Sequence, residues 1–388
     1  MRAATVGTLT LALLGGVAGC DTVKRTYDSW FGAPALSSKP AELVPIQAKV
    51  NPRVLWRGAV GAAGKTVLFP DVSGSAVWVA GANGDIAGFG AADGSNVARF
   101  SAGQAIASGV GAGANLIAVG TPRGEIVAFD RSGKTVWKAQ APGEVLAPPV
   151  ITGNTLIARV GDGAIYAYDA ASGKRRWAYQ RSTPALTVRN HAGVVVSRSL
   201  VFAGFPGGRL IAMSADSGGV LWDSAVALPK GTTELERVAD VTSPPVVDEA
   251  RACAVAFQGR LACFDAVRGT AIWARPISSF SGMGADEKNI YVTDDKSAVS
   301  ALDKSSGGSL WKQDKLSGRG VTRPLAMGRY VIVGDYQGMV HLLSRDDGSF
   351  VGRIATDGSA IAAPPVALDL SSFLVQTRNG GVFAIAPN

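Results

Sequence analysis

The sequence predicts an all-β fold, an eight-bladed β-propeller built from four-stranded antiparallel blades. Three observations predict it: a repeated unit of about forty residues, a period-two alternation of apolar residues within each unit, and complementary fragments at the two ends of the repeat region. Glycine accounts for 49 of the 388 residues, well above the usual share of roughly 7%, as expected for a fold with many tight turns.

A unit of sequence recurs eight times after residue 55. One copy begins at Gly124 and ends at Trp137, and the next begins at Gly163 and ends at Trp177. Within each copy, glycine-containing turns separate segments of alternating polarity, a pattern typical of short antiparallel strands joined by hairpins. The tryptophan is expected to fill the wedge between neighbouring sheets, and the seventh copy lacks it. The copies are marked by an aromatic or aliphatic residue five positions after the first turn residue: Phe89, Phe129, Tyr168, Met213, Phe264, Leu302, Leu343 and Ile385.

The two ends of the repeat region indicate how the fold closes. The last copy stops just after its third strand, whereas Val54, Leu55 and Trp56 supply an unmatched strand before the first copy. Pairing the two pieces makes a complete blade, so the N-terminal strand is expected to join the last blade and close the ring. An open β-solenoid is the main alternative, but it would need caps instead of complementary ends.

The first 19 residues have the features of a secretory signal peptide. They begin with a positive charge at Arg2, continue apolar from about Val6, and end in Ala18 and Gly19 before Cys20. This small-small-Cys ending resembles a bacterial lipobox, which implies cleavage before Cys20 and attachment of a lipid to its thiol. An ordinary signal peptide cleaved nearby is the alternative interpretation.

Residues 20–50 are expected to carry the lipidated cysteine and a flexible tether, and residues 51–388 to form the propeller. The tether contains Pro34, Pro40 and Pro45 among Ser, Lys and Glu residues and shows no sustained period of 2 or 3.6. No stretch after the signal reaches the roughly 18 uninterrupted apolar residues that a membrane helix needs, so the rest of the chain is expected to be soluble.

Cys253 and Cys263 are the two remaining cysteines, with nine residues between them. If they face each other across a hairpin in an oxidising compartment, they form a disulfide that would contribute about 2–3 kcal/mol. Two buried free thiols are the alternative, because the sequence does not give the pairing register that a disulfide requires.

Charge and composition give no sign of catalysis or of nucleic-acid binding. The formal net charge is +8, but Lys and Arg are scattered without a run of four. His191 and His341 are the two histidines, and neither stands in an acid–base or metal-ligand pattern. The glycine-rich residues 109–113 lack the helix and lysine of a phosphate loop. The sequence therefore predicts no catalytic residue, no metal and no cofactor.

The repeated unit Asp-x-x-Ser-Gly-x-x-x-Trp resembles that of quinoprotein dehydrogenases, eight-bladed propellers that hold pyrroloquinoline quinone. Those enzymes resemble one another in carrying adjacent cysteines and a calcium ion held by Glu, Asn and Asp, whereas this shorter chain has no Cys-Cys pair. Likeness of fold does not carry a function by itself. A quinone-dependent periplasmic dehydrogenase and a carbohydrate- or wall-binding propeller are kept as alternative functions.

The lipobox, the short tether and the eight blades together resemble the BamB family, the lipoprotein subunit of the outer-membrane β-barrel assembly machinery. The likeness spans nearly the whole chain and is most specific over residues 232–246 and 334–342. It implies a non-enzymatic scaffold, lipid-anchored in the outer membrane and facing the periplasm. This scaffold would bind the POTRA domains of the barrel-inserting subunit and assist insertion of outer-membrane proteins. Asp21 leaves retention in the inner membrane open, because an aspartate after the lipidated cysteine commonly signals it in enteric bacteria.

The resemblance also implies which residues bind the partner. One contact segment of the family matches Leu186, Val188 and Arg189, with valine where leucine is common. A second segment matches Asp240, while Thr242 stands where a second aspartate is expected.

The spacing of the repeats points to the same segments. Trp177 is 31 residues from Gly208, and Trp222 is 37 residues from Gly259, against 26 residues between the equivalent positions that start at Trp137. Both insertions follow a tryptophan strand, so two neighbouring blades are expected to raise long loops on one rim. Such insertions often form the binding surface of a repeat protein, although tolerated surface loops are the alternative.

Overall fold

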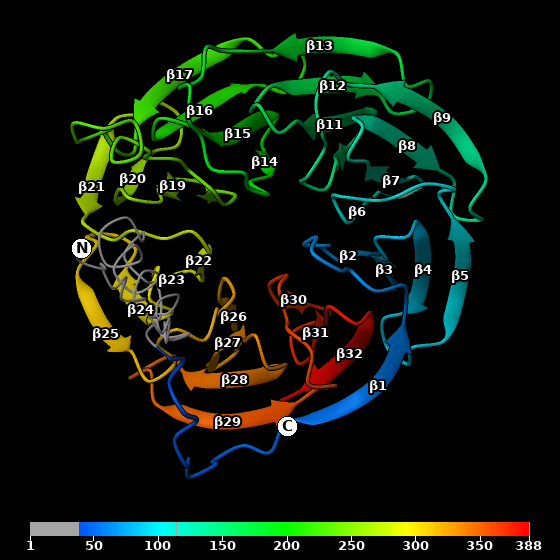
Figure 1. Ribbon diagram of the computed structural model, residues 1–388. Helices are drawn as coiled ribbons and strands as arrows, with labels where there is room; N and C mark the ends of the chain where they lie inside the picture. Colours follow the sequence, from blue (N-terminus) through cyan, green and yellow to red (C-terminus); the bar gives the residue numbers. More distant parts are fainter. Residues whose placement is uncertain (1–38, 114, 388) are drawn as a thin grey trace, which may run out of the picture. The chain divides into compact units, whose positions relative to one another are not determined.

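The computed structural model describes residues 39–113 and 115–387 of the chain. In this part of the chain, 32 strands form eight antiparallel sheets of four strands, which follow one another around a ring (Figure 1). The predicted eight-bladed β-propeller is confirmed. Eight apolar clusters make up the core, and each draws its residues from two neighbouring blades. The blades are therefore held together by burial of apolar surface at every junction.

The first four blades follow the chain without interruption. Blade 1 contains β2 (Asp71–Ser73), β3 (Ala76–Ala80), β4 (Asp85–Gly90) and β5 (Asn96–Ser101). Blade 2 contains β6 (Val110–Ala112), β7 (Ile117–Gly120), β8 (Glu125–Phe129) and β9 (Thr135–Gln140). Blade 3 contains β10 (Val150–Thr152), β11 (Thr155–Arg159), β12 (Ile165–Asp169) and β13 (Arg175–Tyr179). Blade 4 contains β14 (Val194–Ser197), β15 (Leu200–Phe205), β16 (Arg209–Ser214) and β17 (Val220–Ala225).

The last four blades include the one that closes the ring. Blade 5 contains β18 (Val246–Val247), β19 (Arg251–Val255), β20 (Leu261–Asp265) and β21 (Ala271–Arg275). Blade 6 contains β22 (Gly282–Ala285), β23 (Asn289–Thr293), β24 (Val299–Asp303) and β25 (Ser309–Gln313). Blade 7 contains β26 (Leu325–Met327), β27 (Tyr330–Gly334), β28 (Met339–Ser344) and β29 (Phe350–Ala355). Blade 8 contains β30 (Val366–Ala367), β31 (Phe373–Gln376), β32 (Gly381–Ala386) and β1 (Arg53–Ala59).

A β-bulge lies between the two outer strands of every blade. In blade 3 the register shifts between Ala167 and Tyr168, and in blade 5 it shifts between Cys263 and Phe264. The corresponding shift occurs at the marker residue of each of the first seven blades and between Val54 and Trp56 in blade 8. Because a bulge increases the local twist and re-aims the next side chain, it turns the tryptophan of the outer strand toward the neighbouring blade.

The ring closes as the sequence predicts. β1 pairs antiparallel with β32, with Val54 opposite Ile385 and Trp56 opposite Ala384. The two strands come from opposite ends of the described chain and lie side by side in Figure 1, where blue meets red. The N-terminal strand thus supplies the outermost strand of blade 8.

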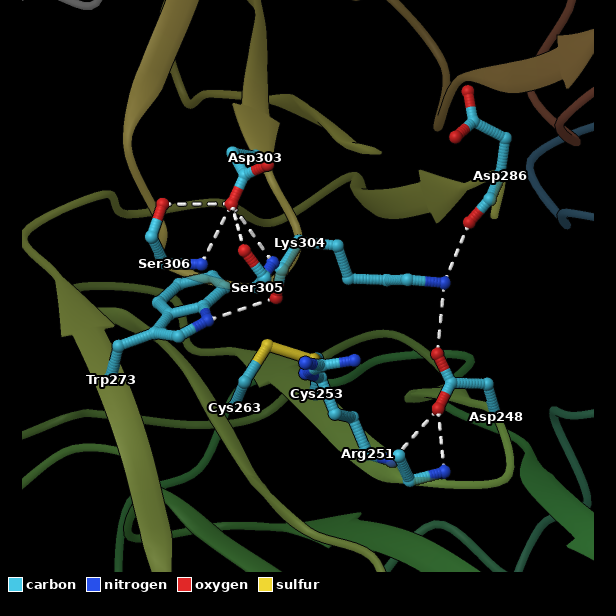
Figure 2. The surroundings of a disulfide bond; sticks show 11 residues. Asp248, Arg251, Cys253, Cys263, Trp273, Asp286, Asp303, Lys304, Ser305 and Ser306 are labelled. Carbon is cyan, nitrogen blue, oxygen red and sulfur yellow. Dashed lines mark hydrogen bonds and ion pairs between the residues drawn. A yellow bond between two sulfur atoms is a disulfide. The ribbon is translucent and has the colours of Figure 1, made fainter. Parts of the chain in front are cut away.

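A tryptophan on the outer strand locks each of six junctions to the next blade. Trp273 of blade 5 donates a hydrogen bond from Nε1 to the carbonyl oxygen of Lys304 in blade 6, at 3.0 Å (Figure 2). Its ring also covers Gly307, which has a φ of 69° and where a Cβ would lie 2.6 Å from the indole. Glycine is required there for both reasons. The other tryptophans that donate in this way are Trp56, Trp137, Trp177, Trp222 and Trp311.

The junction between blades 7 and 8 is built differently. Gly352 stands four residues after the turn glycine Gly348, where blades 2 to 6 carry tryptophan, and its open space is filled by the carbonyl of Val50 and the ring of Pro52. The backbone NH groups of Lys49 and Val50 both donate to the carbonyl of Val351. The chain before the first strand therefore takes the place of the missing indole.

Further contacts extend this segment along blade 7. Arg319 donates to the carbonyl of Ala41 at 2.9 Å, and Arg353 donates to the carbonyl of Val44 at 3.1 Å. Residues 41–52 are called the seam segment below. The prediction of a flexible tether up to residue 50 is wrong for residues 41–50, which are bound to blade 7 by hydrogen bonds and packing. The sequence reasoning missed them because an irregular extended segment has no period.

Candidate functional site

The two long loops expected from the sequence lie on one face of the propeller. The first, residues 180–193, connects β13 to β14, and the second, residues 226–245, connects β17 to β18. They contain 14 and 20 residues, whereas the other connections between successive blades contain 6 to 11. Each connection leads from the outermost strand of one blade to the innermost strand of the next, so all of them lie on the same face.

Asp240 joins the two loops. Its carboxylate accepts a hydrogen bond from the backbone NH of Val188 in the first loop, at 2.7 Å, and one from Gly207 in the turn between β15 and β16, at 2.9 Å. The side chain is only 1% exposed. A buried carboxylate with two backbone donors is well satisfied, so Asp240 fixes the first loop against the second.

A buried arginine of blade 3 also holds the first loop in place. Arg159 of β11 donates to the carbonyl of Ala192 at 2.9 Å, and its guanidinium lies 5.3 Å from the ring centroid of Phe205. Burial lowers the pKa of Arg159 to about 10, against the opposing attraction of Asp240 and Asp162. The group stays protonated at neutral pH, and the charge of Asp240 partly compensates it.

The first loop presents an apolar and a cationic side chain to solvent. Leu186 is 43% exposed. Arg189 forms a two-pronged ion pair with Glu144, with both nitrogen–oxygen distances at 2.9 Å, and its side chain remains largely exposed. The pairing with Glu144 raises the pKa of Arg189. A bidentate pair fixes the direction of the guanidinium while leaving one of its faces open.

The second loop carries two exposed leucines that the sequence analysis did not single out. Leu228 is 63% exposed and Leu235 is 67% exposed. Leu235 sits in a single turn in which Glu236 accepts hydrogen bonds from the backbone of Thr232 and Thr233. Because these hydrogen bonds hold the turn, they keep the Leu235 side chain exposed to solvent. The length of the insertion was the signal for this segment, but length does not show which side chains face outward.

The predicted partner-binding residues therefore divide into two groups. Leu186 and Arg189 are exposed, and Val188 is partly buried with its backbone tied to Asp240. The expectation that Asp240 itself lies on the binding surface is corrected, because its carboxylate is buried and used by the two loops. Thr242 is also buried, and its hydroxyl donates to the carbonyl of Phe280 at 2.9 Å. A polar residue inside a loop gives no sequence signal of its burial.

The structure joins Cys253 and Cys263 by a disulfide within blade 5. The two residues stand directly opposite each other in β19 and β20, and both are buried. Figure 2 shows the disulfide beside Trp273 and below Lys304, whose ammonium reaches Asp248 at 2.8 Å and the carbonyl of Asp286 at 2.7 Å. Blades 5 and 6 are thus cross-linked by a buried cation next to the indole lock.

The two histidines are structural in their contacts. His191 donates from Nδ1 to the carbonyl of Leu146 at 3.0 Å, and burial lowers its pKa. His341 is fully buried, lies 3.1 Å from the carboxylate of Asp335, and likewise has a pKa lowered by burial. Within residues 39–113 and 115–387, no group of three His, Cys, Asp or Glu side chains is placed to hold a metal ion.

The predicted lipid-attachment residue Cys20 and its neighbour Asp21 lie outside the described residues.

The described part of the chain contains no helix that combines the length and apolar character needed to cross a bilayer.

Comparison with known proteins gives consistent matches. The family model described as outer membrane protein assembly factor BamB matches residues 82–313 and 295–387. The outer membrane protein assembly factor BamB of Burkholderia pseudomallei is 42% identical over 349 residues, which cover 90% of this chain and 91% of that protein. The crystal structure of BamB from Moraxella catarrhalis superposes with a TM-score of 0.78 at 24% identity, covering 86% of this chain and 99% of that one.

A quinoprotein also shares the fold. A quinohemoprotein alcohol dehydrogenase from Pseudomonas putida superposes with a TM-score of 0.72 over 89% of this chain and 78% of that one, but at only 13% identity. This likeness is one of fold alone. The family model and the relative of nearly equal length decide the question of ancestry, and the chain belongs to the BamB family of outer membrane protein assembly factors.

Proposed function

We propose that this chain is a scaffold subunit of the outer membrane protein assembly complex and that it carries out no chemistry of its own. The proposal is supported by the names of relatives that match it over nine-tenths of its length. It places the protein at the outer membrane. A rigid ring with long loops on one face suits a protein that holds other proteins in position.

The finer part of the proposal concerns the partner. The two loops on one face would contact the POTRA domains of the barrel-inserting subunit, through the exposed Leu186, Arg189, Leu228 and Leu235, called the two-loop surface below. The observation that carries this idea is Asp240, whose buried carboxylate ties the two loops into one unit. Loops that are already ordered lose little conformational entropy on binding, and apolar residues beside an arginine are typical interface anchors.

The anchoring of the chain is also part of the proposal. Cys20 would carry a lipid that holds the ring at the periplasmic side of the outer membrane. The buried disulfide agrees with an oxidising compartment such as the periplasm. Mass spectrometry of the mature N-terminal peptide tests this: a diacylated cysteine 20 is expected, and an unmodified N terminus elsewhere would overturn it. Separation of inner and outer membranes tests whether Asp21 retains the protein in the inner membrane.

A pull-down from native membranes in mild detergent tests the partner contact. With the wild-type chain as bait, we expect recovery of the barrel-inserting subunit. The double variant Leu186→Asp/Arg189→Ala should reduce this recovery at least tenfold, because an apolar anchor and a cation are both removed. Thermal unfolding should change little, because both side chains lie at the surface, with Leu186 43% exposed.

A matched variant on the other face controls for general effects of surface charge. Leu370 is 96% exposed and Arg329 is exposed, and both lie in turns between the two inner strands of their blades. Leu370→Asp/Arg329→Ala should leave recovery unchanged. Full recovery with the Leu186→Asp/Arg189→Ala variant would remove the two-loop surface as the contact. Asp240→Asn is expected to weaken recovery indirectly and to expose residues 180–193 to protease, because it releases the loop from its anchor.

A further inference from the structure

The propeller contains a cavity on its axis, on the same face as the two long loops. Two adjoining hollows of about 290 and 300 Å³ share four lining residues, Phe69, His191, Pro244 and Arg323. These residues precede the innermost strands of blades 1, 4, 5 and 7, which stand around the whole ring in Figure 1. Residues from opposite sides of a ring can line one cavity only near its centre, so the cavity is axial.

Arg323 is a cation without a counter-charge in this cavity. Among the described residues, its guanidinium makes no hydrogen bond and no ion pair, and burial lowers its pKa. The acidic side chain among the lining residues is Asp71, whose carboxylate already accepts hydrogen bonds from the backbone NH groups of Val72, at 2.9 Å, and Ala112, at 2.8 Å. A partly desolvated guanidinium with no anion beside it is unfavourable unless a ligand supplies the anion.

Ser243 is a second cavity residue with an unsatisfied polar group. It lines the cavity and is 4% exposed, yet its hydroxyl has no hydrogen-bond partner within the described residues. Gly282 lies between it and the arginine, because a Cβ at this glycine would come within 2.6 Å of the Ser243 hydroxyl and 3.5 Å of Cδ of Arg323. A buried hydroxyl and a guanidinium, separated by a residue without a side chain, form an open pair of donors.

The walls of the cavity define the class of ligand. Phe69, Pro244, Phe280 and Val321 supply apolar surface around the two donors. Such a site suits a planar monoanion carried on an apolar group, because one guanidinium offers a two-pronged match to a carboxylate. Arg378 also lines the first hollow, but it is exposed, so Arg323 is the partly desolvated cation of the cavity. The volume admits a few residues of extended chain and no folded domain.

We propose that the axial cavity binds a carboxylate of an extended peptide segment, held by Arg323 and Ser243 with its neighbouring side chain against Phe69 and Phe280. The carboxylate belongs either to a chain terminus or to an acidic side chain. This site is separate from the two-loop surface, and its occupation does not depend on the partner contact proposed above.

Two peptides that differ in one group test the proposal without any variant. Isothermal titration of the full mature chain with Ac-Ala-Ala-Ala-Leu-OH and with the same peptide ending in an amide compares the presence and absence of a terminal carboxylate. Ac-Ala-Glu-Ala-Leu-NH₂ supplies a side-chain carboxylate instead. Binding of either acidic peptide, at least tenfold tighter than that of the amide, supports the proposal, and which one binds identifies the source. Equal binding of all three peptides, or binding of none, overturns it.

Variants then assign the donors. Arg323→Gln should weaken binding of the acidic peptide at least tenfold, and Ser243→Ala should weaken it less, because it removes a neutral donor. Arg329→Gln, an exposed arginine in the turn after β26, should change nothing. Without peptide, Arg323→Gln should raise Tm, because an unpaired cation leaves a partly desolvated site. Unchanged peptide affinity in Arg323→Gln, or a lowered Tm, would show that the arginine serves the fold and would overturn the assignment.

Discussion

Two junctions of the ring solve the same packing problem with different parts of the chain. Between blades 5 and 6, Trp273 fills the wedge and donates a hydrogen bond to the carbonyl of Lys304. The Lys304 ammonium forms an ion pair with Asp248 of blade 5. Between blades 7 and 8, Gly352 leaves the wedge empty, and Val50 and Pro52 enter it from outside the repeat. The first junction is made by residues about 30 to 60 positions apart, and the second by residues about 300 apart.

This difference shows what the repeat alone can and cannot build. Tryptophan serves six of the eight junctions, including the one between blades 8 and 1. Between blades 1 and 2, where Ala98 stands at the tryptophan position, Phe100 of the same strand lies over the turn glycine Gly133. The two outer strands of blade 8, β32 and β1, come from opposite ends of the described chain, so no turn joins them for an indole of blade 7 to cover. The seam segment occupies the place of that indole. The four predictions below test this contrast, beginning with the largest expected effect.

Removing a tryptophan from a blade junction should lower the free energy of unfolding the most. Trp273→Ala is expected to lower the free energy of unfolding by about 3–5 kcal/mol, because it leaves a large cavity between blades 5 and 6 and removes the hydrogen bond to Lys304. Chemical denaturation followed by circular dichroism measures it. Val267→Ala, at a side chain that is 67% exposed, is the control and should cost under about 0.5 kcal/mol. A loss below about 1 kcal/mol for Trp273→Ala would mean that the indoles do not hold the blades.

Removing the disulfide should lower the free energy of unfolding less, because the bond lies within one blade. The double variant Cys253→Ala/Cys263→Ala is expected to cost about 2–3 kcal/mol, since the bond closes a short loop in the unfolded chain. Wild-type protein unfolded in the presence of reductant should behave in the same way. If the variant instead opened the junction with blade 6, protease would cleave at residues 303–307, and the disulfide would have to be counted as part of the lock.

The seam should respond to a single methyl group. Gly352→Ala places a Cβ 3.0 Å from the carbonyl of Val50 and 3.2 Å from Pro52, and we expect a loss of about 1–2 kcal/mol together with faster proteolysis within residues 41–52. Gly143→Ala is the matched control, because its Cβ would meet no atom closer than 3.7 Å. Equal protease resistance in Gly352→Ala and wild type would separate the seam segment from the closure of the ring.

The smallest effect should be a dependence of the seam on pH. Burial lowers the pKa of His341 below 6.5, whereas the unfolded chain binds the proton at its ordinary pKa. Stability is therefore fully present above pH 6.5 and decreases as the pH falls below it. His341 lies between Asp335 and Arg353, and Arg353 holds Val44, so protonation adds a charge beside the arginine that fastens the seam segment.

Proteolysis of the seam segment at pH 7.5 and pH 5.5 measures this dependence. Cleavage should be faster at pH 5.5 in wild type, and His341→Gln should reduce the difference. His191→Gln is the control, because that histidine also has a lowered pKa but lies away from blade 7. Burial alone would raise the pKa of Asp335, but hydrogen bonds from His341, Met339 and Arg319 lower it. Its own contribution is therefore lost only below about pH 4, outside the tested range.

The sequence predicted the parts of the molecule that repeat. The eight markers, the alternating strands and the closing strand at Trp56 follow from a pattern that recurs often enough to be recognised. The seam segment and the burial of Asp240 could not be predicted, because both depend on contacts between distant positions that no repeated pattern marks. Arg323 has no sequence signal either, since an arginine without a partner looks the same as one on the surface.

The pairing of β1 with β32 has a consequence for how the protein is made. β1 leaves a ribosome or a translocation channel before β32, the strand that it pairs with, which follows more than 300 residues later. Until then the edge of β1 stays unpaired, and any chain that terminates early cannot complete its ring. During synthesis, therefore, the edge of β1 is covered only in a chain that has been extended as far as β32.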